Sequence, residues 1–380
     1  MNFNFTEEQL MIQQAARDFA ERELLPDVIE RDTNATFPHR QMKLLAELGF
    51  FGITVSPEYG GSGMDSISYV LALEEIAKID AAAAVVLAVH NSLTCYGIEH
   101  FANEEQKRKF LPDLASGKKI GAFLLSEAEA GSDATSLKTI AEDKGDHYLL
   151  NGTKIWITSA DNAGIYIVVA HTHPELKHRG INAFIVDRHS PGITLGPHEN
   201  KMGMRSSDTH PVMFTDVKVP KENRIGDDGF GFKFAMKVLD AGRMGIAAQA
   251  MGIAGGAFDL AVKYSKERKT FGTEIANHQA IAFKLADMAV KLENGRNLVY
   301  KSAWQKDNGI NFSVMSAMAK QYCADVAMEI TTEAVQIHGG YGYVKEYHVE
   351  RLMREAKLTQ IYEGTSEIQK IIISRAILKE

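Results

Sequence analysis

The chain has 380 residues, which is enough for two or three domains with sizeable cores. Hydrophobic residues make up 45% and charged residues 24%, the balance of an ordinary soluble globular protein. A net charge of −7 argues against a nucleic-acid or anionic-membrane partner. No apolar run reaches the roughly 18 residues of a membrane span.

The cysteines and the first residues predict a cytoplasmic protein. Cys95 and Cys323 are too few for a disulfide framework and favour a reducing compartment. The segment Thr6 to Gln9 has the pattern of a helix cap, so no signal peptide is expected.

Residues 1–118 predict an N-terminal helical domain. Apolar residues recur at helical spacing after the Thr6 cap, and further helices are expected over 41–48, 66–78 and 81–100.

Residues 119–226 predict a middle antiparallel β domain. Tyr148 to Ile157 contains two short runs joined by Asn151-Gly152, which predicts a hairpin. Further strands are expected over 165–170, 181–187 and 212–219. No long helix interrupts them, which favours an antiparallel sheet over a parallel α/β sheet.

Residues 227–380 predict a C-terminal domain of long helices, over 232–267, 278–307 and 312–337, whose lengths suit an antiparallel bundle. Ser366 and Gln369 fit a capping box, so a last helix is expected to begin near Ser366.

Two segments of the β domain could bind a cofactor. The loop Ser126 to Asp133 offers hydroxyls, a glycine and backbone donors for a heterocycle or a phosphate, or it is an ordinary turn. Trp156 and Thr158 share a strand face, where they would contact a ring system or be a core tryptophan beside a surface threonine.

Two segments of the helical domain have structural explanations as well as functional ones. Arg268 near a helix C-terminus either complements the helix dipole or binds a phosphate. The segment Gln336 to Gly340 reads as a helix end, and Gly340-Tyr341-Gly342 follows a helix rather than a strand, so it is no dinucleotide fingerprint.

The sequence indicates neither a metal site nor a catalytic serine or cysteine nucleophile. His171, His173 and His178 lack a carboxylate partner and ligand spacing, so no metal is expected. Neither a G-x-S-x-G motif nor a local cysteine-nucleophile signature occurs.

Glu363 is the candidate catalytic base. It lies between an aromatic residue and Gly364, just before the predicted last helix. By itself this segment favours a solvated surface charge, which is what most loop glutamates are.

Eight segments, in this order, resemble the acyl-CoA dehydrogenase family over essentially the whole chain. The resemblance is nearest to its short-chain (butyryl-CoA) members. The segments are Pro57–Gly63, Ser126–Asp133, Asn151–Thr158, Met202–Thr209, Asp240–Arg243, Glu267–Gly272, Gln336–Gly342 and Ile361–Gln369.

The resemblance implies FAD as cofactor and a C-terminal four-helix bundle in a homotetramer built as a dimer of dimers. It implies cofactor contacts from Phe123, Leu125, Ser126, Gly131, Ser132, Trp156, Ile157, Thr158, Thr365, Ser366 and Glu367. A neighbouring subunit would add Arg268, Gln279, Gln336, Ile337, His338, Gly339 and Gly340, and Phe271 would be a further cofactor residue. Ser132, Asp240, Arg243, Tyr362 and Gly364 would contact the acyl-CoA substrate.

The implied reaction is α,β-dehydrogenation of a short-chain acyl-CoA, with electrons passed to an electron-transfer flavoprotein. Glu363 would remove the α-proton, and burial under the acyl chain would raise its pKa towards neutrality. Some relatives carry the base where this chain has Gly242, and glycine cannot take a proton. Many relatives have Thr-Glu-Pro where this chain has Ser126-Glu127-Ala128, and the missing proline predicts a looser loop.

Three alternatives stay open at this point. They are medium- or branched-chain substrates, transfer of electrons to oxygen as in an oxidase, and a non-catalytic scaffold with the same fold. Chain length and physiological direction are not fixed by the sequence.

Overall fold

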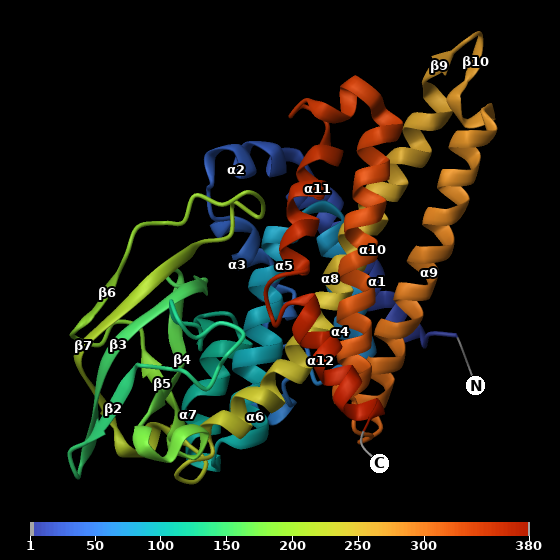
Figure 1. Cartoon of the computed structure of the whole chain (residues 1–380). Coiled ribbons are helices and arrows are strands. Elements are labelled where there is room, and N and C mark those ends of the chain that lie inside the picture. The colour runs from blue at the N-terminus through green and yellow to red at the C-terminus, as the bar shows by residue number, and fades with distance from the viewer. Residues whose placement is uncertain (1–3, 379–380) are drawn as a thin grey trace.

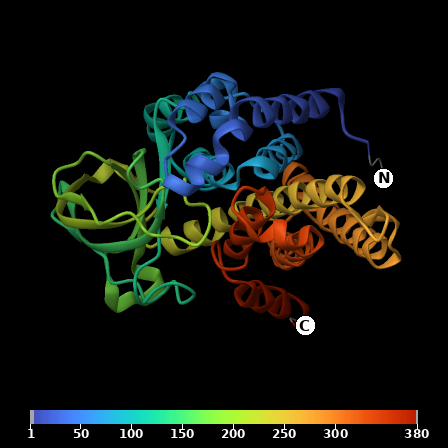
Figure 2. The same ribbon diagram turned by 90° about the horizontal axis from the view of Figure 1, so that it is seen from above.

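The computed structural model describes residues 4–378, with a β region at one end of two helical parts (Figures 1 and 2). The helices of the first part are α1 (Glu7–Phe19), α2 (Val28–Asn34), α3 (His39–Glu47), α4 (Ser66–Ile79), α5 (Ala81–Ala88), α6 (Tyr96–Phe101) and α7 (Glu104–Ala115). The predicted cap of α1 is confirmed, because the Thr6 and Gln9 side chains bond to each other's backbone N–H groups.

The expected helix over 81–100 is interrupted by a π-helical segment, Val89–Cys95, between α5 and α6. Two segments, Ala81–Phe101 and Gly231–Glu267, are long and apolar enough to cross a membrane. Their most apolar windows are 94% and 78% buried inside the protein, as core helices of a soluble fold would be.

The central sheet holds eight strands, β1 (Ile120–Leu124), β2 (Ile140–Asp143), β3 (His147–Thr158), β4 (Ala163–His171), β5 (Ile181–Asp187), β6 (Ile193–Leu195), β7 (Thr209–Pro220) and β8 (Arg224–Ile225). Most neighbours are antiparallel, as predicted. However, β4 pairs in parallel with β1 and β2, which the sequence did not indicate.

The predicted hairpin at Asn151-Gly152 is wrong, because β3 is one continuous strand of 12 residues. Asn151 instead exchanges two hydrogen bonds with Asp216 on β7, at 2.9 and 3.0 Å. Gly152 lies against Thr139, where a Cβ atom would come within 2.5 Å of the threonine hydroxyl. The glycine therefore allows a close backbone approach opposite a bulge on β7, and no turn forms there.

The C-terminal part is built on α8 (Gly231–Glu267), α9 (Gln279–Asp307), α10 (Ser313–His338), α11 (His348–Thr359) and α12 (Ser366–Ile377). Helix α10 packs against α8, α9 and α11, and α8 also packs against α9, as in a four-helix bundle. A small hairpin of β9 (Lys269–Thr270) and β10 (Thr273–Glu274) joins α8 to α9 at one end of the bundle (Figure 1). The predicted order of helical, β and helical parts is confirmed.

Candidate active site

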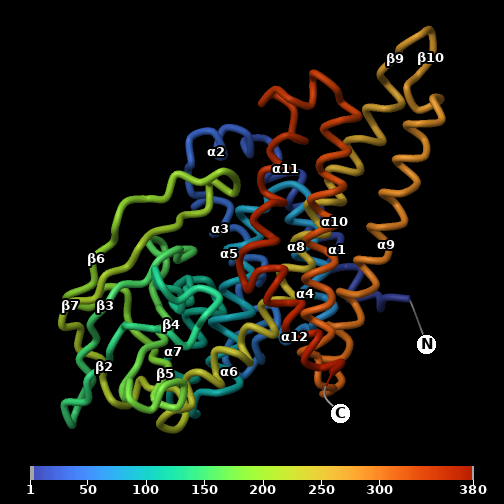
Figure 3. Tube along the Cα trace, in the orientation of Figure 1, coloured from blue at the N-terminus to red at the C-terminus, as the bar shows by residue number. Residues whose placement is uncertain are grey.

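Glu363 lies in the short loop between α11 and α12, which Figure 3 traces. Both Glu363 (φ 55°) and Gly364 (φ 86°) adopt left-handed backbone conformations, which are costly for glutamate. Two hydrogen bonds fix this loop. Lys320 Nζ and Gln369 Nε2 both donate to the Gly364 carbonyl, at 2.6 and 2.8 Å.

The start of the last helix differs in detail from the prediction. The N-cap of α12 is Thr365, whose hydroxyl accepts from the Ile368 N–H at 3.3 Å. Ser366 instead donates to Asp325 at 3.3 Å, and Gln369 turns back to the carbonyls of the Glu363 loop. The helix begins where predicted, but the capping box does not form.

The Glu363 carboxylate points against Gly242 on α8. A Cβ atom at Gly242 would lie 2.6 Å from Glu363 Oε2 and 2.8 Å from Leu93 Cδ2, so only glycine fits between the base and the π-helical segment. Oε2 is buried and has no hydrogen-bond donor among the residues that the structure describes. Burial raises the pKa of Glu363 to about 7, and the nearby charges of Arg243 and Lys320 oppose that rise.

Arg243 and Asp240 stand one turn apart on α8 and form an ion pair. Arg243 is buried, and burial lowers its pKa. Asp240 also accepts a 2.9 Å hydrogen bond from Ser313 and lines a groove of about 1080 Å³. Arg243 therefore lies near Glu363, and its partner Asp240 lines the groove.

The loop after β1 is held by a buried ion pair rather than by a proline. Lys154 Nζ donates to the Leu125 carbonyl at 2.9 Å and to Glu127 Oε1 at 2.7 Å. Glu127 also accepts from the backbone N–H groups of Lys138 and Thr139. The loop that the sequence predicted to be loose is thus fixed at Leu125 and Glu127.

Trp156 and Thr158 present side chains on the open side of β3. A bulge lies between Lys154 and Ile157, Trp156 has a left-handed backbone (φ 62°), and its indole is 62% exposed. Ser126 lies beside this bulge, because its carbonyl accepts from the Ile155 N–H at 3.0 Å.

These groups fit the edge and face of a flat heterocycle. Within residues 4–378, neither the Ser126 nor the Thr158 hydroxyl has a protein hydrogen-bond partner. At Gly131, an added Cβ would meet nothing within 4 Å, so the loop is open there. An exposed indole with free hydroxyls and open backbone suits the FAD ring system that the resemblance implies.

The β region approaches Glu363 through the loop that holds Met204. Met204 Sδ lies 3.8 Å from Gln249 Nε2 on α8, and Gln249 accepts a hydrogen bond from the Tyr362 hydroxyl. Arg354 on α11 donates to the Met202 carbonyl at 2.9 Å. The hydrogen bond to Gln249 fixes Tyr362, a predicted substrate residue, directly before the base. Gly364, the predicted substrate residue directly after the base, is held through its carbonyl by Lys320 and Gln369.

The remaining predicted cofactor residues gather at the far end of the bundle. His338 lies 18 residues after Lys320, about 27 Å along α10. Arg268 there lies over the Tyr341 ring at 5.8 Å, and Phe271 on the β9–β10 turn is 99% exposed. Gln279, Gln336, Gly339 and Gly340 are also exposed. This set, which we call the distal group, is too far from Glu363 to share one chain's flavin ring with it.

Several predicted cofactor residues have buried side chains. Ile157 belongs to the core of the β region and Ile337 to the main core, and Leu125 is 9% exposed. His338 stacks on Tyr264 at 4.2 Å and contacts the Ala334 carbonyl. Ser132 and Glu367 are exposed, while Phe123 and Thr365 are half-buried.

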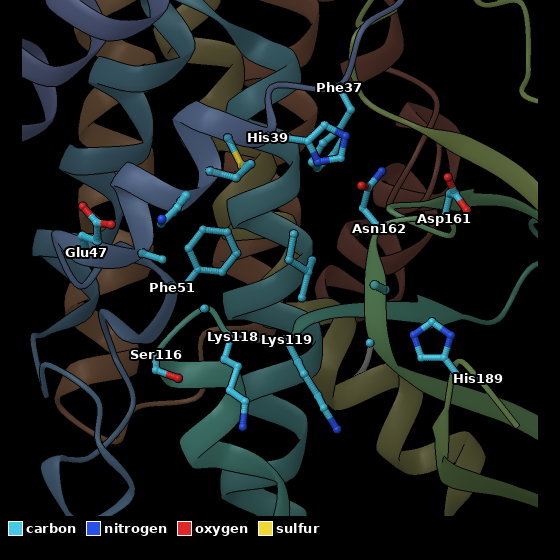
Figure 4. A pocket seen from close by; sticks show the side chains of 17 residues that line it. Phe37, His39, Glu47, Phe51, Ser116, Lys118, Lys119, Asp161, Asn162 and His189 are labelled. Carbon is cyan, nitrogen blue, oxygen red and sulfur yellow. The ribbon is translucent and has the colours of Figure 1, made fainter.

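A second cavity, of about 670 Å³, lies between α3 and the sheet (Figure 4). His39, Lys119, Asn162 and His189 are among its lining residues, and none of the predicted site residues lines it. Across residues 4–378, no group of three or more His, Cys, Asp or Glu side chains could hold a metal ion.

The sequence interpretation missed Lys154, Gln249 and Lys320. All three are buried polar side chains at the site. For Lys320 a signal exists in the sequence, because a lysine among alanines and methionines on a core helix is unusual. For Lys154, treating β3 as one strand would have placed it on the inward face.

Three family models match the chain. They describe the N-terminal domain of acyl-CoA dehydrogenase over residues 6–118, the middle domain over 122–217 and the C-terminal domain over 229–378.

Individual relatives match over nearly the whole chain. A short-chain-specific acyl-CoA dehydrogenase of Clostridium acetobutylicum is 47% identical over 379 residues, with 100% of both chains covered. CarC, a subunit of the caffeyl-CoA reductase–Etf complex of Acetobacterium woodii, is 47% identical, with 99% of this chain and 100% of the relative covered. The solved structure of butyryl-CoA dehydrogenase from Megasphaera elsdenii superposes with a TM-score of 0.99 at 49% identity, with 100% of both chains covered. The chain therefore belongs to the acyl-CoA dehydrogenase family of oxidoreductases, which are FAD-dependent flavoproteins.

Proposed function

We propose that this protein dehydrogenates a short-chain acyl-CoA to the trans-2-enoyl-CoA, with Glu363 as the base that removes the α-proton. The observation that carries the proposal is Oε2 of Glu363, which is buried against Gly242 with no hydrogen-bond donor among residues 4–378. A general base works best with a pKa near the operating pH, and burial raises the pKa of Glu363 to about 7.

The loop also supplies a donor for the thioester carbonyl. No residue in the described part of the chain accepts a hydrogen bond from the Glu363 backbone N–H. This free N–H supports a role in stabilising the negative charge that develops on the carbonyl oxygen as the α-proton leaves. When bound, FAD supplies the acceptor at N5 for the β-hydrogen and its electron pair, which balances the two-electron oxidation.

Each FAD would be bound by residues from two subunits. Ser126, Trp156 and Thr158 would hold the flavin ring in one chain, and the Thr365–Glu367 stretch would lie beside it. The distal group, exposed and remote from this chain's own Glu363, would serve a neighbouring subunit. We therefore propose a homotetramer, built as a dimer of dimers.

A short acyl chain agrees with the side chains around the base. Leu93 lies against Gly242, and one turn further along α8 the Tyr69 hydroxyl would lie 2.7 Å from a Cβ atom on Gly245. The buried Tyr69 hydroxyl has no hydrogen-bond partner within the described residues. We propose that these two side chains limit the space beside α8 for a longer acyl chain. Asp240 and Arg243 would lie along the path of the CoA portion, beside the groove that Asp240 lines.

We propose an electron-transfer flavoprotein as electron partner, because CarC, which belongs to an Etf complex, is similar over the whole chain. CarC is a subunit of a reductase, so reduction of an enoyl-CoA is a second candidate for the physiological direction. We expect a cytoplasmic location, with no nucleic-acid or membrane partner.

Anaerobic titration of the yellow protein with acyl-CoAs of increasing chain length tests the proposal. We expect bleaching of the flavin absorbance to be most complete and fastest with butyryl-CoA. Strongest bleaching by a medium- or branched-chain thioester would overturn the short-chain assignment. Absence of bleaching by any acyl-CoA would overturn the proposed activity. Rapid peroxide formation in air would favour an oxidase.

A further inference from the structure

Lys320 on α10 is a charged group buried beside the proposed base. Its side chain is 0% exposed, and Nζ donates a 2.6 Å hydrogen bond to the Gly364 carbonyl. Burial lowers the pKa of Lys320 to about 8, so the ammonium form still predominates at neutral pH. Because a buried charge costs several kcal/mol unless it is compensated, its position needs an explanation.

Lys320 holds a strained stretch of backbone at the proposed base. Glu363 and Gly364 are two consecutive left-handed residues, a conformation that the surroundings must enforce. Lys320 and Gln369 converge on the Gly364 carbonyl, one with a charged donor and the other with a neutral one. Asp325, further along α10, accepts from Gln360 at 2.7 Å and so holds the other side of the loop. Helix α10 thus sets the direction of the Glu363 side chain.

Lys320 also places a positive charge near the Glu363 carboxylate. Lys320 and Glu363 attract each other electrostatically, although these two described residues form no direct ion pair within 4.0 Å. Arg243 also attracts Glu363, but it is already paired with Asp240. The other titratable groups that face Glu363 or Lys320 are Tyr69 on α4, Tyr362 in the loop, Asp325 on α10 and Glu367 on α12. Within residues 4–378, Lys320 therefore differs from Arg243 in being a cation near the base that forms no ion pair with a carboxylate.

We propose that Lys320 is a positioning residue for proton abstraction. Its ammonium fixes the Gly364 carbonyl, and with it the Glu363 side chain, and it lowers the cost of ionising the base. The inference deepens the proposed function and rests on the role of Glu363 in it.

The matched variants are Lys320→Met, Lys320→Arg and Gln369→Met. Lys320→Met removes both the donor and the charge, and Lys320→Arg keeps both in a larger side chain. Gln369→Met removes a neutral donor to the same carbonyl. Lys320→Gln replaces Lys320→Met if the latter does not fold.

The measurement is the limiting rate of flavin reduction by butyryl-CoA in stopped flow, between about pH 6 and pH 9. For Lys320→Met we expect the apparent pKa of the rising limb to increase by about one unit. The rate near pH 6 should therefore fall about tenfold more than the rate near pH 9. Lys320→Arg should restore the wild-type pKa, and Gln369→Met should lower the plateau without moving the pKa.

A second measurement reports proton abstraction alone, without hydride transfer to the flavin. Acetoacetyl-CoA has acidic α-protons, and the absorbance of its bound enolate reports deprotonation at the site. Its pH dependence should shift in Lys320→Met by the same amount. If Lys320→Met loses only thermal stability or FAD, with the wild-type pH profile, Lys320 is merely structural and the inference is overturned. If no acyl-CoA reduces the wild-type protein, the proposed function fails and takes this inference with it, which is a different outcome.

Discussion

At the scale of single residues, Glu363 differs from a surface carboxylate in its backbone and in its burial. The left-handed φ angle of 55° directs its side chain towards Gly242, and Oε2 is buried there without a donor within residues 4–378. Five of the non-glycine residues with positive φ, namely Trp156, Ser159, Met204, Phe271 and Glu363, lie in or next to the proposed site segments. Strained backbone is often retained where function requires it.

We expect Glu363→Gln to keep FAD and to lose flavin reduction by butyryl-CoA by about a thousandfold or more. The amide fills the same space but cannot accept the α-proton. The control is Glu105→Gln, at an exposed position on α7, which should leave the rate unchanged. Near-normal reduction in Glu363→Gln, measured by stopped flow, would contradict the assignment of the base.

The pH dependence follows from the raised pKa of Glu363. Reduction requires the ionised carboxylate, so the rate should rise with pH through about 7. Stability should change in the opposite direction. The folded pKa exceeds the ordinary value of 4.5, so the stability that the neutral form contributes is present below pH 4.5 and is lost as pH rises to about 7.

Glu363→Gln should therefore be more stable than the wild type above pH 7, by about 2–4 kcal/mol. Near pH 4.5 the two proteins should unfold alike. Thermal midpoints of the two FAD-loaded proteins at both pH values test this expectation. An equal difference at the two pH values would show that the carboxylate does not titrate as described.

At the scale of elements, β3 carries both the exposed Trp156, which we propose faces the flavin, and the buried Lys154. A continuous strand with a bulge lets Trp156 face outward, while Lys154 points inward to Glu127. Alternation along a strand was readable from the sequence, but the hairpin interpretation divided the strand at Gly152. The glycine's actual partner, Thr139, is on the segment that leads into β2, and local patterns do not reveal such a contact.

We expect Lys154→Met to destabilise the protein by about 3–5 kcal/mol, because it leaves the Glu127 carboxylate buried without its cation. FAD affinity should fall as well, since the loop at Leu125 loses its donor. The exposed pair of Lys138 and Glu129 provides the matched control, Lys138→Met. Thermal midpoint and flavin fluorescence report the two effects.

The double variant Lys154→Met/Glu127→Gln distinguishes charge from packing. It should recover part of the lost stability, because no unpaired carboxylate remains. A double variant as unstable as Lys154→Met would show that packing, and not the ion pair, holds the loop.

At the scale of the whole molecule, the predicted cofactor residues separate into those of the β region and the α11–α12 loop and those at the distal end of the C-terminal bundle. Ser126 and Trp156 belong to the β region and Glu363 to the loop before α12, whereas the distal group lies around the β9–β10 hairpin. This separation is what the proposed sharing of FAD between two subunits requires.

We expect Arg268→Ala to weaken FAD retention and tetramer assembly, because the guanidinium lies exposed among the distal group. Lys266→Ala, two residues earlier and equally exposed, is the control. Light scattering after size exclusion gives the assembly state, and the ratio of flavin to protein absorbance gives retention. A stable tetramer with undiminished FAD would contradict the role of Arg268.

Periodicity and turn signals in the sequence predicted the order of helical and β parts, because these are local properties of the chain. The family, the FAD cofactor, the role of Glu363 and the exclusion of a base at position 242 followed from the resemblance of short segments to the acyl-CoA dehydrogenase family. Only the folded chain shows that Gly242 faces Glu363, that Lys320 and Gln369 hold its loop, and that Lys154 fixes the loop after β1. It also shows the parallel pairing of β1 with β4 and the continuity of β3. Each of these depends on contacts between residues far apart in the chain, whose free energies no local pattern encodes.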